Sequence, residues 1–301
     1  MISVVLALLA AAGNATASVL QRRAARSVPK DKAFRPALVL ALVRDPVWLG
    51  GIAALVGGFL FQAAALSVGA LALVQPVLVI ELPFTMVLLS WMFGVKLDRR
   101  SWLAVGTVTV GVSVFLVSAA PGPGRQTPTS AEWVMATVVT IGTVIGLVMV
   151  ARLFTGAGRA AALGVATGVG FAFTATFIKE STSVFQRDPA ALPASWQLYA
   201  MVVAGLCSLF LLQNALHSGP LVAAQPALTV SDPVAGILYG TTMFGEHVRT
   251  GHWILLEATG ITLIIYGSFR LAKSLPSGLG HKTPRRGHES RLGRTRGERG
   301  R

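Results

Sequence analysis

The sequence predicts an all-α, polytopic membrane protein. The 301-residue chain is 53% hydrophobic and only 13% charged, and its mean hydropathy is +0.66. These values lie outside the range of ordinary soluble domains. The chain carries a net charge of +14, but its basic residues lie mostly between long apolar runs and in the C-terminal tail. That pattern orients a protein in a bilayer, so we expect no nucleic-acid partner.

Nine apolar segments are long enough to cross the bilayer as helices. The first has no basic residue ahead of it, unlike a secretory signal, so we expect it to remain as an uncleaved span. The nine segments cover about residues 1–21, 47–68, 70–93, 102–120, 133–151, 160–178, 196–216, 220–244 and 253–271.

Two segments are too polar or too short to cross. Residues 22–46 form a basic linker, in which 37–43 are expected to lie along the membrane interface as a short helix. Residues 272–301 are rich in Gly, Ser, Pro and Arg, and we expect a disordered cytoplasmic tail.

The Lys and Arg residues predict the orientation. If the N-terminus lies outside, 22 of these residues fall on the cytoplasmic side and 4 on the other, and the split is still 12 to 4 without the tail. By the positive-inside rule, we expect a multi-pass protein of the cell membrane with its C-terminus in the cytoplasm.

An internal duplication organises the chain. Residues 66–83 read LSVGALALVQPVLVIELP and recur at 216–233 as LHSGPLVAAQPALTVSDP, with seven identities that include a Gly, a Gln-Pro pair and a final Pro. We expect two four-helix units, at 1–120 and 160–271, joined by a connector at 121–159 that holds the fifth helix. Equivalent helices are five spans apart, and this odd number inverts the second unit relative to the first, as in many secondary transporters.

Each copy carries one acidic residue in an uncharged run, Glu81 in the first and Asp232 in the second. They lie 11 and 12 residues after the expected helix starts, so at 1.5 Å per residue they reach roughly 16 to 18 Å, near the bilayer centre. A carboxylate there costs about 2.5 to 3.5 kcal/mol, so it is rarely kept without a use. We therefore predict that both bind substrate and serve as candidate metal ligands.

The prolines of the two copies support this site and also leave an alternative. Pro83 and Pro233 are expected to free the carbonyl oxygens of Val79 and Thr229 beside the acids. On ideal helices, however, Glu81 lies about 140° from Pro76 and Asp232 about 240° from Pro226. The alternative that at least one acid is only a local structural partner therefore stays open.

Further polar residues within the spans are candidate substrate ligands, although such residues also join helices together. They are Gln75, Gln225, Gln62, Gln213, Asn214 and Asn14. Lys179 and Glu180 are expected either at a cavity mouth or in a simple interfacial ion pair. Glu246 and Glu257 are expected in water near helix ends, and Cys207 is expected to be a small buried hydrophobe.

The sequence has no GK[ST] phosphate loop, no HExxH and no Ser/His/Asp pattern. We therefore expect neither an enzyme nor a cofactor, and energy has to come from an ion gradient or the gradient of the solute.

Several motifs in order resemble the drug/metabolite transporter superfamily with its EamA-type repeats. They read ALSVG, QP, FGVKLDRRSW and GTVTVG in the first half, and ALHSG, QP, FGEHVRTGHW and ATG in the second. The basic linker, LVRDPVWLGG and the KE ending the sixth span resemble the NIPA-type magnesium transporters. The resemblance implies secondary transport by a bundle one helix short of ten. It also implies that a glutamate with a helix-terminal structural role is kept at Glu246 and replaced by Val95.

Three functions remain open from sequence. The first is transport of a small cationic solute, either Mg²⁺ or an organic cation exchanged for H⁺. The second is proton-coupled export of a neutral or zwitterionic metabolite. The third is a non-transporting scaffold or lipid-handling protein in the bilayer. The oligomeric state is not predicted.

Overall fold

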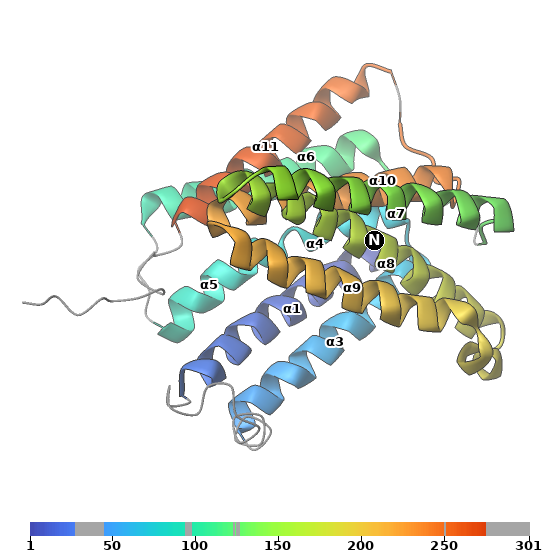
Figure 1. The fold of residues 1–301 in the computed structure, drawn as a ribbon, viewed down its shortest axis with the longest axis horizontal. Helices are drawn as coiled ribbons and strands as arrows, with labels where there is room; N and C mark the ends of the chain where they lie inside the picture. Colours follow the sequence, from blue (N-terminus) through green and yellow to red (C-terminus); the bar gives the residue numbers. More distant parts are fainter. Residues whose placement is uncertain (28–44, 94–97, 123, 125–126, 250, 275–301) are drawn as a thin grey trace, which may run out of the picture.

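The computed structural model describes all of residues 1–301 except 28–44, 94–97, 123, 125–126, 250 and 275–301. The described residues form a bundle of helices, and their only β pairing is an isolated bridge between Gly122 and His247. The expected interface helix at 37–43 and most of the expected tail lie outside the described residues. The elements (Figure 1) are α1 Ile2–Ser27, α3 Pro46–Val68, α4 Leu71–Leu78, α5 Glu81–Phe93, α6 Arg99–Ala119, α7 Ser130–Leu153, α8 Ala157–Arg187, the 3₁₀ helix η2 Pro189–Ala194, α9 Trp196–Ser218, α10 Leu221–Thr242 and α11 Trp253–Ser274.

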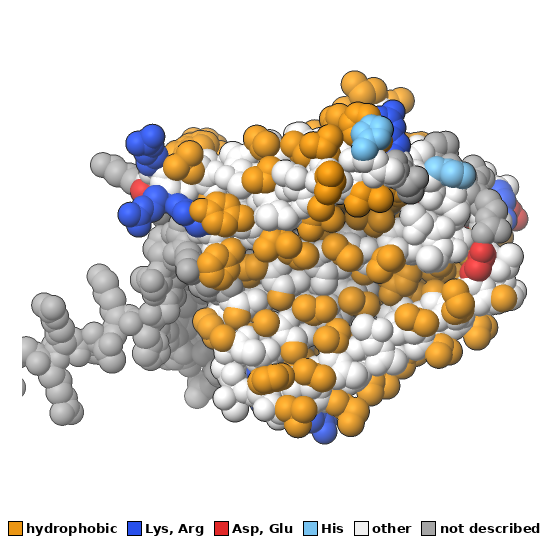
Figure 2. Space-filling view, turned by 90° about the horizontal axis from the view of Figure 1, so that it is seen from above, with side chains coloured by type: hydrophobic (Ala, Val, Ile, Leu, Met, Phe, Trp, Pro, Cys, Tyr) orange, Lys and Arg blue, Asp and Glu red, His pale blue; other side chains and the backbone are white. Residues whose placement is uncertain are grey.

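The chain is a multi-pass membrane protein. Eight stretches in the described part are long and apolar enough to cross a bilayer, with α4 and α5 together making one of them. Hydrophobic side chains cover the middle of the face seen in Figure 2, while the few charged ones lie near its edges. On α9, large apolar side chains such as Leu206 and Phe210 are exposed, as expected for a surface in contact with lipid. Cys207 is also exposed there, so the expectation that it is buried is wrong.

α10 is not among the eight stretches, which are drawn from described residues only, although its 22 residues are long enough. It carries Gln225, Pro226, Asp232 and Pro233. It is nevertheless packed inside the bundle against α8, α4 and α11. The neighbouring helices supply the apolar environment that this helix needs.

Local capping sets where several helices begin. The Asp45 carboxylate accepts the Val47 N–H at 2.8 Å, and Pro46 begins α3, where its missing N–H is not needed. The Asp98 carboxylate accepts the N–H and the hydroxyl of Ser101 at the start of α6. These bonds hold the pKa of Asp98 below its ordinary value.

Small residues bring the main helix pairs close together. Between α1 and α3, a Cβ added at Gly13 would lie 2.8 Å from the Cα of Gly58. Between α6 and α11, a Cβ added at Gly111 would lie 2.9 Å from the carbonyl oxygen of Gly260. α8 packs in the same way against both α9 and α10. Close backbone approach at glycine is a typical way for helices to associate in a membrane.

Tight turns at Gly69 and Gly219, which the sequence also predicts, would make the helices on either side antiparallel neighbours, and this prediction is wrong. α3 and α4 contact each other little, as do α9 and α10. The two glycines are extended, and they pack against the starts of other helices, Gly69 on Ser3 and Gly219 on Gly156. The flanking helices therefore diverge, and α1 and α8 fill the space beside them. We call the two ends of the bundle the Gly69 end and the Gly219 end.

Candidate functional site

A helix break separates α4 from α5 just before Glu81. The N–H groups of Val79 and Ile80 donate to the carbonyl oxygens three residues earlier, at 3.3 and 3.1 Å. The span expected at 70–93 is present as one apolar stretch, Leu71–Met92, but it is divided into two helices. Glu81 becomes the first residue of α5, and it is the eleventh residue of the 22-residue apolar stretch.

The Val79 carbonyl is not free, contrary to expectation. It accepts the N–H of Leu82 at 3.1 Å. Pro83 does remove one donor, but the tight turn supplies another donor from the residue before the proline. The proposed carbonyl ligand beside Glu81 is therefore already occupied in this conformation.

In the second repeat, α10 corresponds to α4 and α5 together. It differs from them because it runs unbroken through Pro226 and Pro233. Asp232 is the twelfth of its 22 residues, so it too lies at mid-length. The Asp232 N–H nitrogen lies 2.8 Å from where a Cβ of Gly168 in α8 would be. This tight packing buries the Asp232 oxygen Oδ1, which has no hydrogen-bond partner among the described residues.

The structure brings the two acids into the same region. The Asn14 side chain of α1 is a hydrogen-bond partner of Glu81. The charge of Glu81 in turn acts on Asp232. Three of the predicted site residues, from α1, α5 and α10, thus lie near one another as a polar cluster, and both acids are at mid-length of their segments.

Gln75 lies beside this cluster. It is buried, and its Oε1 has no partner in the part of the chain that the structure describes. Its Cγ lies 2.7 Å from where a Cβ of Gly236 would be, so its stem packs directly on α10. Gly236 is one helical turn beyond Asp232, and Gln225 is two turns before it, so all three lie on one face of α10. Gln225 is half-buried.

Three other candidates are not brought to the cluster by any described contact. Gln62 is half-buried on α3, and Gln213 is exposed on α9. The Asn214 amide donates to the Phe210 carbonyl of its own helix at 2.8 Å. α9 packs against α8 and only weakly against α10, which leaves Gln213 and Asn214 on the outer side of the bundle.

The cluster offers mainly acceptor atoms. Two carboxylates and the unpartnered Gln75 Oε1 suit a guest that brings positive charge or hydrogen-bond donors. The described residues hold no group of three or more His, Cys, Asp or Glu side chains that could bind a metal. A Mg²⁺ ion there would have to keep several water ligands, as this ion usually does.

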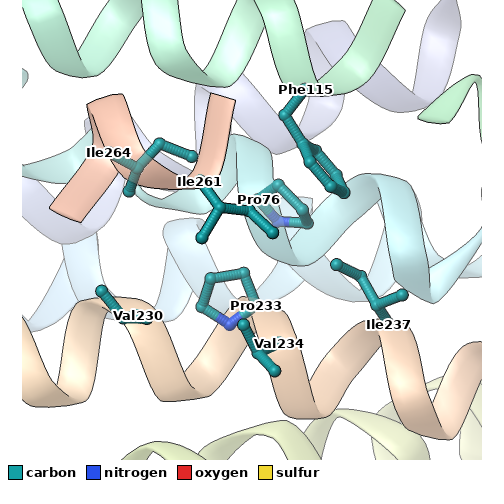
Figure 3. Close-up of a pocket in the computed structure, with 8 residues that line it drawn as sticks. All are labelled: Pro76, Phe115, Val230, Pro233, Val234, Ile237, Ile261 and Ile264. Carbon is teal, nitrogen blue, oxygen red and sulfur yellow. The ribbon is translucent and has the colours of Figure 1, made fainter. Parts of the chain in front are cut away.

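A small pocket lies on the other side of α4 and α10 and contains none of the predicted ligands. Figure 3 shows Pro76 and Pro233 in this pocket together with Phe115 of α6 and Ile261 and Ile264 of α11. All of its lining side chains are apolar. Such a pocket suits hydrocarbon and not a hydrated ion.

Sequence reasoning missed a buried charged cluster at the Gly69 end. Glu246, expected in water, is buried, and its carboxylate accepts the N–H groups of Leu71 and Ala72 at 2.7 and 2.9 Å. It also forms an ion pair with Lys179. The available signal was the second-half Gly-Glu motif, whose glutamate was expected to have a helix-terminal structural role. Its position follows α10 in sequence, but its partner is the start of α4.

The other acids also differ from expectation. Glu180 is buried and pairs with Arg187 at 3.2 Å, and Lys179 pairs with Glu246, so the two neighbours do not form an ion pair with each other. Glu257, expected in water, is half-buried, and its Oε1 has no partner among the described residues.

One relative emerges from comparison with known proteins. A Corynebacterium glutamicum protein, described as uncharacterized, is 28% identical over 266 residues, which are 88% of this chain and 92% of that protein. No protein-family model matches the chain. No solved structure matches it either. The relative has nearly the same extent, but its description names no activity.

Proposed function

We propose that this protein is a secondary transporter that moves a small cationic solute through a site at the bilayer midplane. The observation that carries the proposal is the approach of Glu81 and Asp232, one from each copy of the repeat, with the Asp232 Oδ1 buried and unpartnered among the described residues. When both carboxylates are ionised they repel each other, and a bound cation would offset the repulsion. Placing both acids in lipid without a use would be costly.

The helix pairing supports two inverted repeats within a nine-span plan. α1 packs on α3 as α8 packs on α9, and the equivalent helices α6 and α11 pack on each other. α4 and α10, which hold the equivalent Gln-Pro pairs, also meet. A two-fold axis in the membrane plane would generate these relations. In this plan α7 is the connector, since it contacts mainly α8.

The two repeats differ in shape, as alternating access requires. The first repeat has a broken third span, while the equivalent α10 is continuous. In the described chain, α4 packs closely on α10 whereas α5 packs mainly on α1. Beyond the break, the third span therefore turns away from α10. Exchange of the two shapes between the repeats would open the site alternately to each side.

The cargo we propose is Mg²⁺, held with several of its waters, or an organic cation exchanged for H⁺. The orientation has the N-terminus and the Gly69 end outside the cell membrane and the C-terminus in the cytoplasm. We also propose membership of the drug/metabolite transporter superfamily, with NIPA-type magnesium transporters as the nearest layout. The motifs quoted above and the paired helices support this assignment.

One observation favours a second function, that of a membrane scaffold or lipid-handling protein. The acids lie in close packing, and the pocket beside Pro76 and Pro233 is apolar. A protein that never opens would show both features. So would a transporter that is closed around its site, and solute flux distinguishes the two.

The test is uptake into liposomes. The purified protein would be reconstituted with a Mg²⁺ indicator inside, and in parallel with a panel of organic cations. We expect flux in wild type and a loss of at least about tenfold in Glu81→Gln and in Asp232→Asn, because each removes one of two charges that hold the cargo. The matched control is Glu257→Gln, which neutralises a half-buried acid outside the cluster, on α11. This variant should keep the wild-type flux.

Wild-type flux in the double variant Glu81→Gln/Asp232→Asn would remove the proposed site. No flux of any cation in wild type, combined with a pH-driven flux of neutral or zwitterionic metabolites, would support the proton-coupled alternative. No flux of any kind would support the scaffold.

A further inference from the structure

The start of α4 is held in place by one side chain from the other repeat. α4 is eight residues long and begins after the Gly69 turn. Its first N–H groups have no partner within the helix. The Glu246 oxygens Oε1 and Oε2 accept the N–H groups of Leu71 and Ala72. A carboxylate at a helix N-terminus is favourable because it meets both these donors and the positive end of the helix dipole.

Lys179 of α8 completes this contact. Its ammonium group pairs with Glu246 and donates to the Gly69 carbonyl at 3.3 Å. It also lies 4.7 Å from the ring centroid of Phe244. The Glu246 side chain is 0% exposed and that of Lys179 is 12% exposed. The charges thus compensate each other inside the protein, and the contact closes the Gly69 end.

Gly240 of α10 makes room for this carboxylate. A Cβ at Gly240 would clash with Oε2 of Glu246, and it would lie 3.2 Å from the Ala72 nitrogen. The glycine therefore lets α10, Glu246 and α4 meet at one point. The loop that carries Glu246 is tied further by the Gly122 N–H to the His247 carbonyl at 2.8 Å and the Arg249 N–H to the Ala119 carbonyl at 2.9 Å.

The first repeat has no glutamate that corresponds to Glu246. The residue that corresponds to Glu246 in the first repeat is Val95, and a valine side chain cannot accept a hydrogen bond. The ends of the two repeats are therefore chemically different.

We infer that Glu246, Lys179 and the start of α4 form an ionic lock that keeps the Gly69 end of the transport path closed. The inference rests on the proposed function and adds to it two positioning residues and a preferred closed side. α4 is a rigid segment of about 12 Å, at 1.5 Å per residue, between the lock and the break before Glu81. Gln75 lies on this segment. Release of the lock therefore frees α4, which carries Gln75 and leads into Glu81.

Thiol labelling in detergent tests the lock without any solute. Val74 on α4 and Val108 on α6 are both valines with 0% exposure. Each would be replaced by cysteine in a Cys207→Ser background, and the labelling rate with a polar maleimide would be measured. Glu246→Gln is expected to raise the rate at Val74→Cys by about tenfold, because a buried thiol reacts only when its segment opens. Val108 shares a core cluster with Val79 just after α4, but it also packs directly on Gly267 of α11, so the rate at Val108→Cys should stay within about twofold.

A second variant disrupts the contact between Glu246 and α4 without changing a charge. Gly240→Ala adds the Cβ that clashes with Glu246, so it should raise the Val74→Cys rate in the same direction. Melting curves recorded for each variant show whether it is folded. Unchanged Val74→Cys labelling in both folded variants would overturn the inference. An equal rise at Val108→Cys would also overturn it, because that outcome is general loosening.

This experiment separates the lock from the transport proposal. If the lock variants open α4 but wild type carries no solute, the lock stands as a conformational contact and the transport function fails. If wild type transports and labelling does not respond, the site stands and the lock fails.

Discussion

The side chain of Gln75 packs directly against the backbone of Gly236. Its Cγ lies 2.7 Å and its Cβ 3.0 Å from where a Cβ of residue 236 would be. At this point α4 and α10 meet, and the two copies of the repeat come into contact beside Asp232. The contact depends on glycine because there is no room for a methyl group.

Gly236→Ala should therefore destabilise the protein by about 1 to 3 kcal/mol, the usual penalty for overpacking a closely packed interior. The measurement is unfolding of the purified protein in detergent. Gly57→Ala is the matched control, since nothing lies within 4 Å of a Cβ at Gly57. It should stabilise α3 by about 0.5 to 1 kcal/mol, because alanine loses less conformational freedom in a helix. A similar effect at both sites would contradict the close approach at Gly236.

Lys179 and Glu246 should be strongly coupled in a double-mutant cycle. Lys179→Met leaves a buried carboxylate without its cation, and this should cost about 3 to 5 kcal/mol. Glu246→Gln leaves a buried ammonium group without its partner. The double variant should lose less than the sum of the two single losses because no unpaired charge remains. Additive losses, measured by unfolding in detergent, would show that the pair is not formed.

Acid should weaken the start of α6. Hydrogen bonds from Ser101 hold the pKa of Asp98 below its ordinary value. The stability that Asp98 contributes is thus fully present above the ordinary aspartate pKa, and it is lost as pH falls through the lower folded value. Melting temperatures of wild type and Asp98→Ala should therefore converge on acidification. A difference that stays constant from neutral to acidic pH would refute this role.

Asn14 should support the site through Glu81. Removing the amide by Asn14→Ala deletes a hydrogen bond to a charged group, which is worth about 1.5 to 3 kcal/mol, so cation binding should weaken at least tenfold. Asn214→Ala is the control because that amide bonds to its own helix. Thermal stabilisation by Mg²⁺ and by organic cations gives the affinities. Equal affinities in the two variants would remove Asn14 from the site.

Much of the helical plan could be predicted from hydrophobicity alone. The span expected at 196–216 is α9, and that expected at 47–68 is α3, each within two residues of the observed ends. α8 departs most, since it continues nine residues past 178 to Arg187, and α1 continues six residues past 21 to Ser27. The α8 extension carries Lys179 and Glu180, whose ion pairs with Glu246 and Arg187 compensate their charges and allow the helix to continue.

Two of the errors have different causes. Glu246 was expected in water because its partners are distant in sequence, and the Val79 carbonyl was expected to be free because a regular helix would pair it with the N–H that Pro83 lacks. Their actual partners are the start of α4 and the N–H of Leu82. The first lies about 175 residues away along the chain, so no local pattern reveals it.

The sequence by itself determined that the chain is helical, that it crosses a bilayer several times and that two acids lie halfway along equivalent segments, because bilayer thickness and the helix rise convert residue number into depth. Only the tertiary structure decided which polar groups meet. Asn14 joins Glu81, Gln213 faces away, and Glu246 closes on α4, because helix rotation and the positions of glycines set these contacts. Hydrophobicity is nearly uniform around such helices, so it does not specify their rotation.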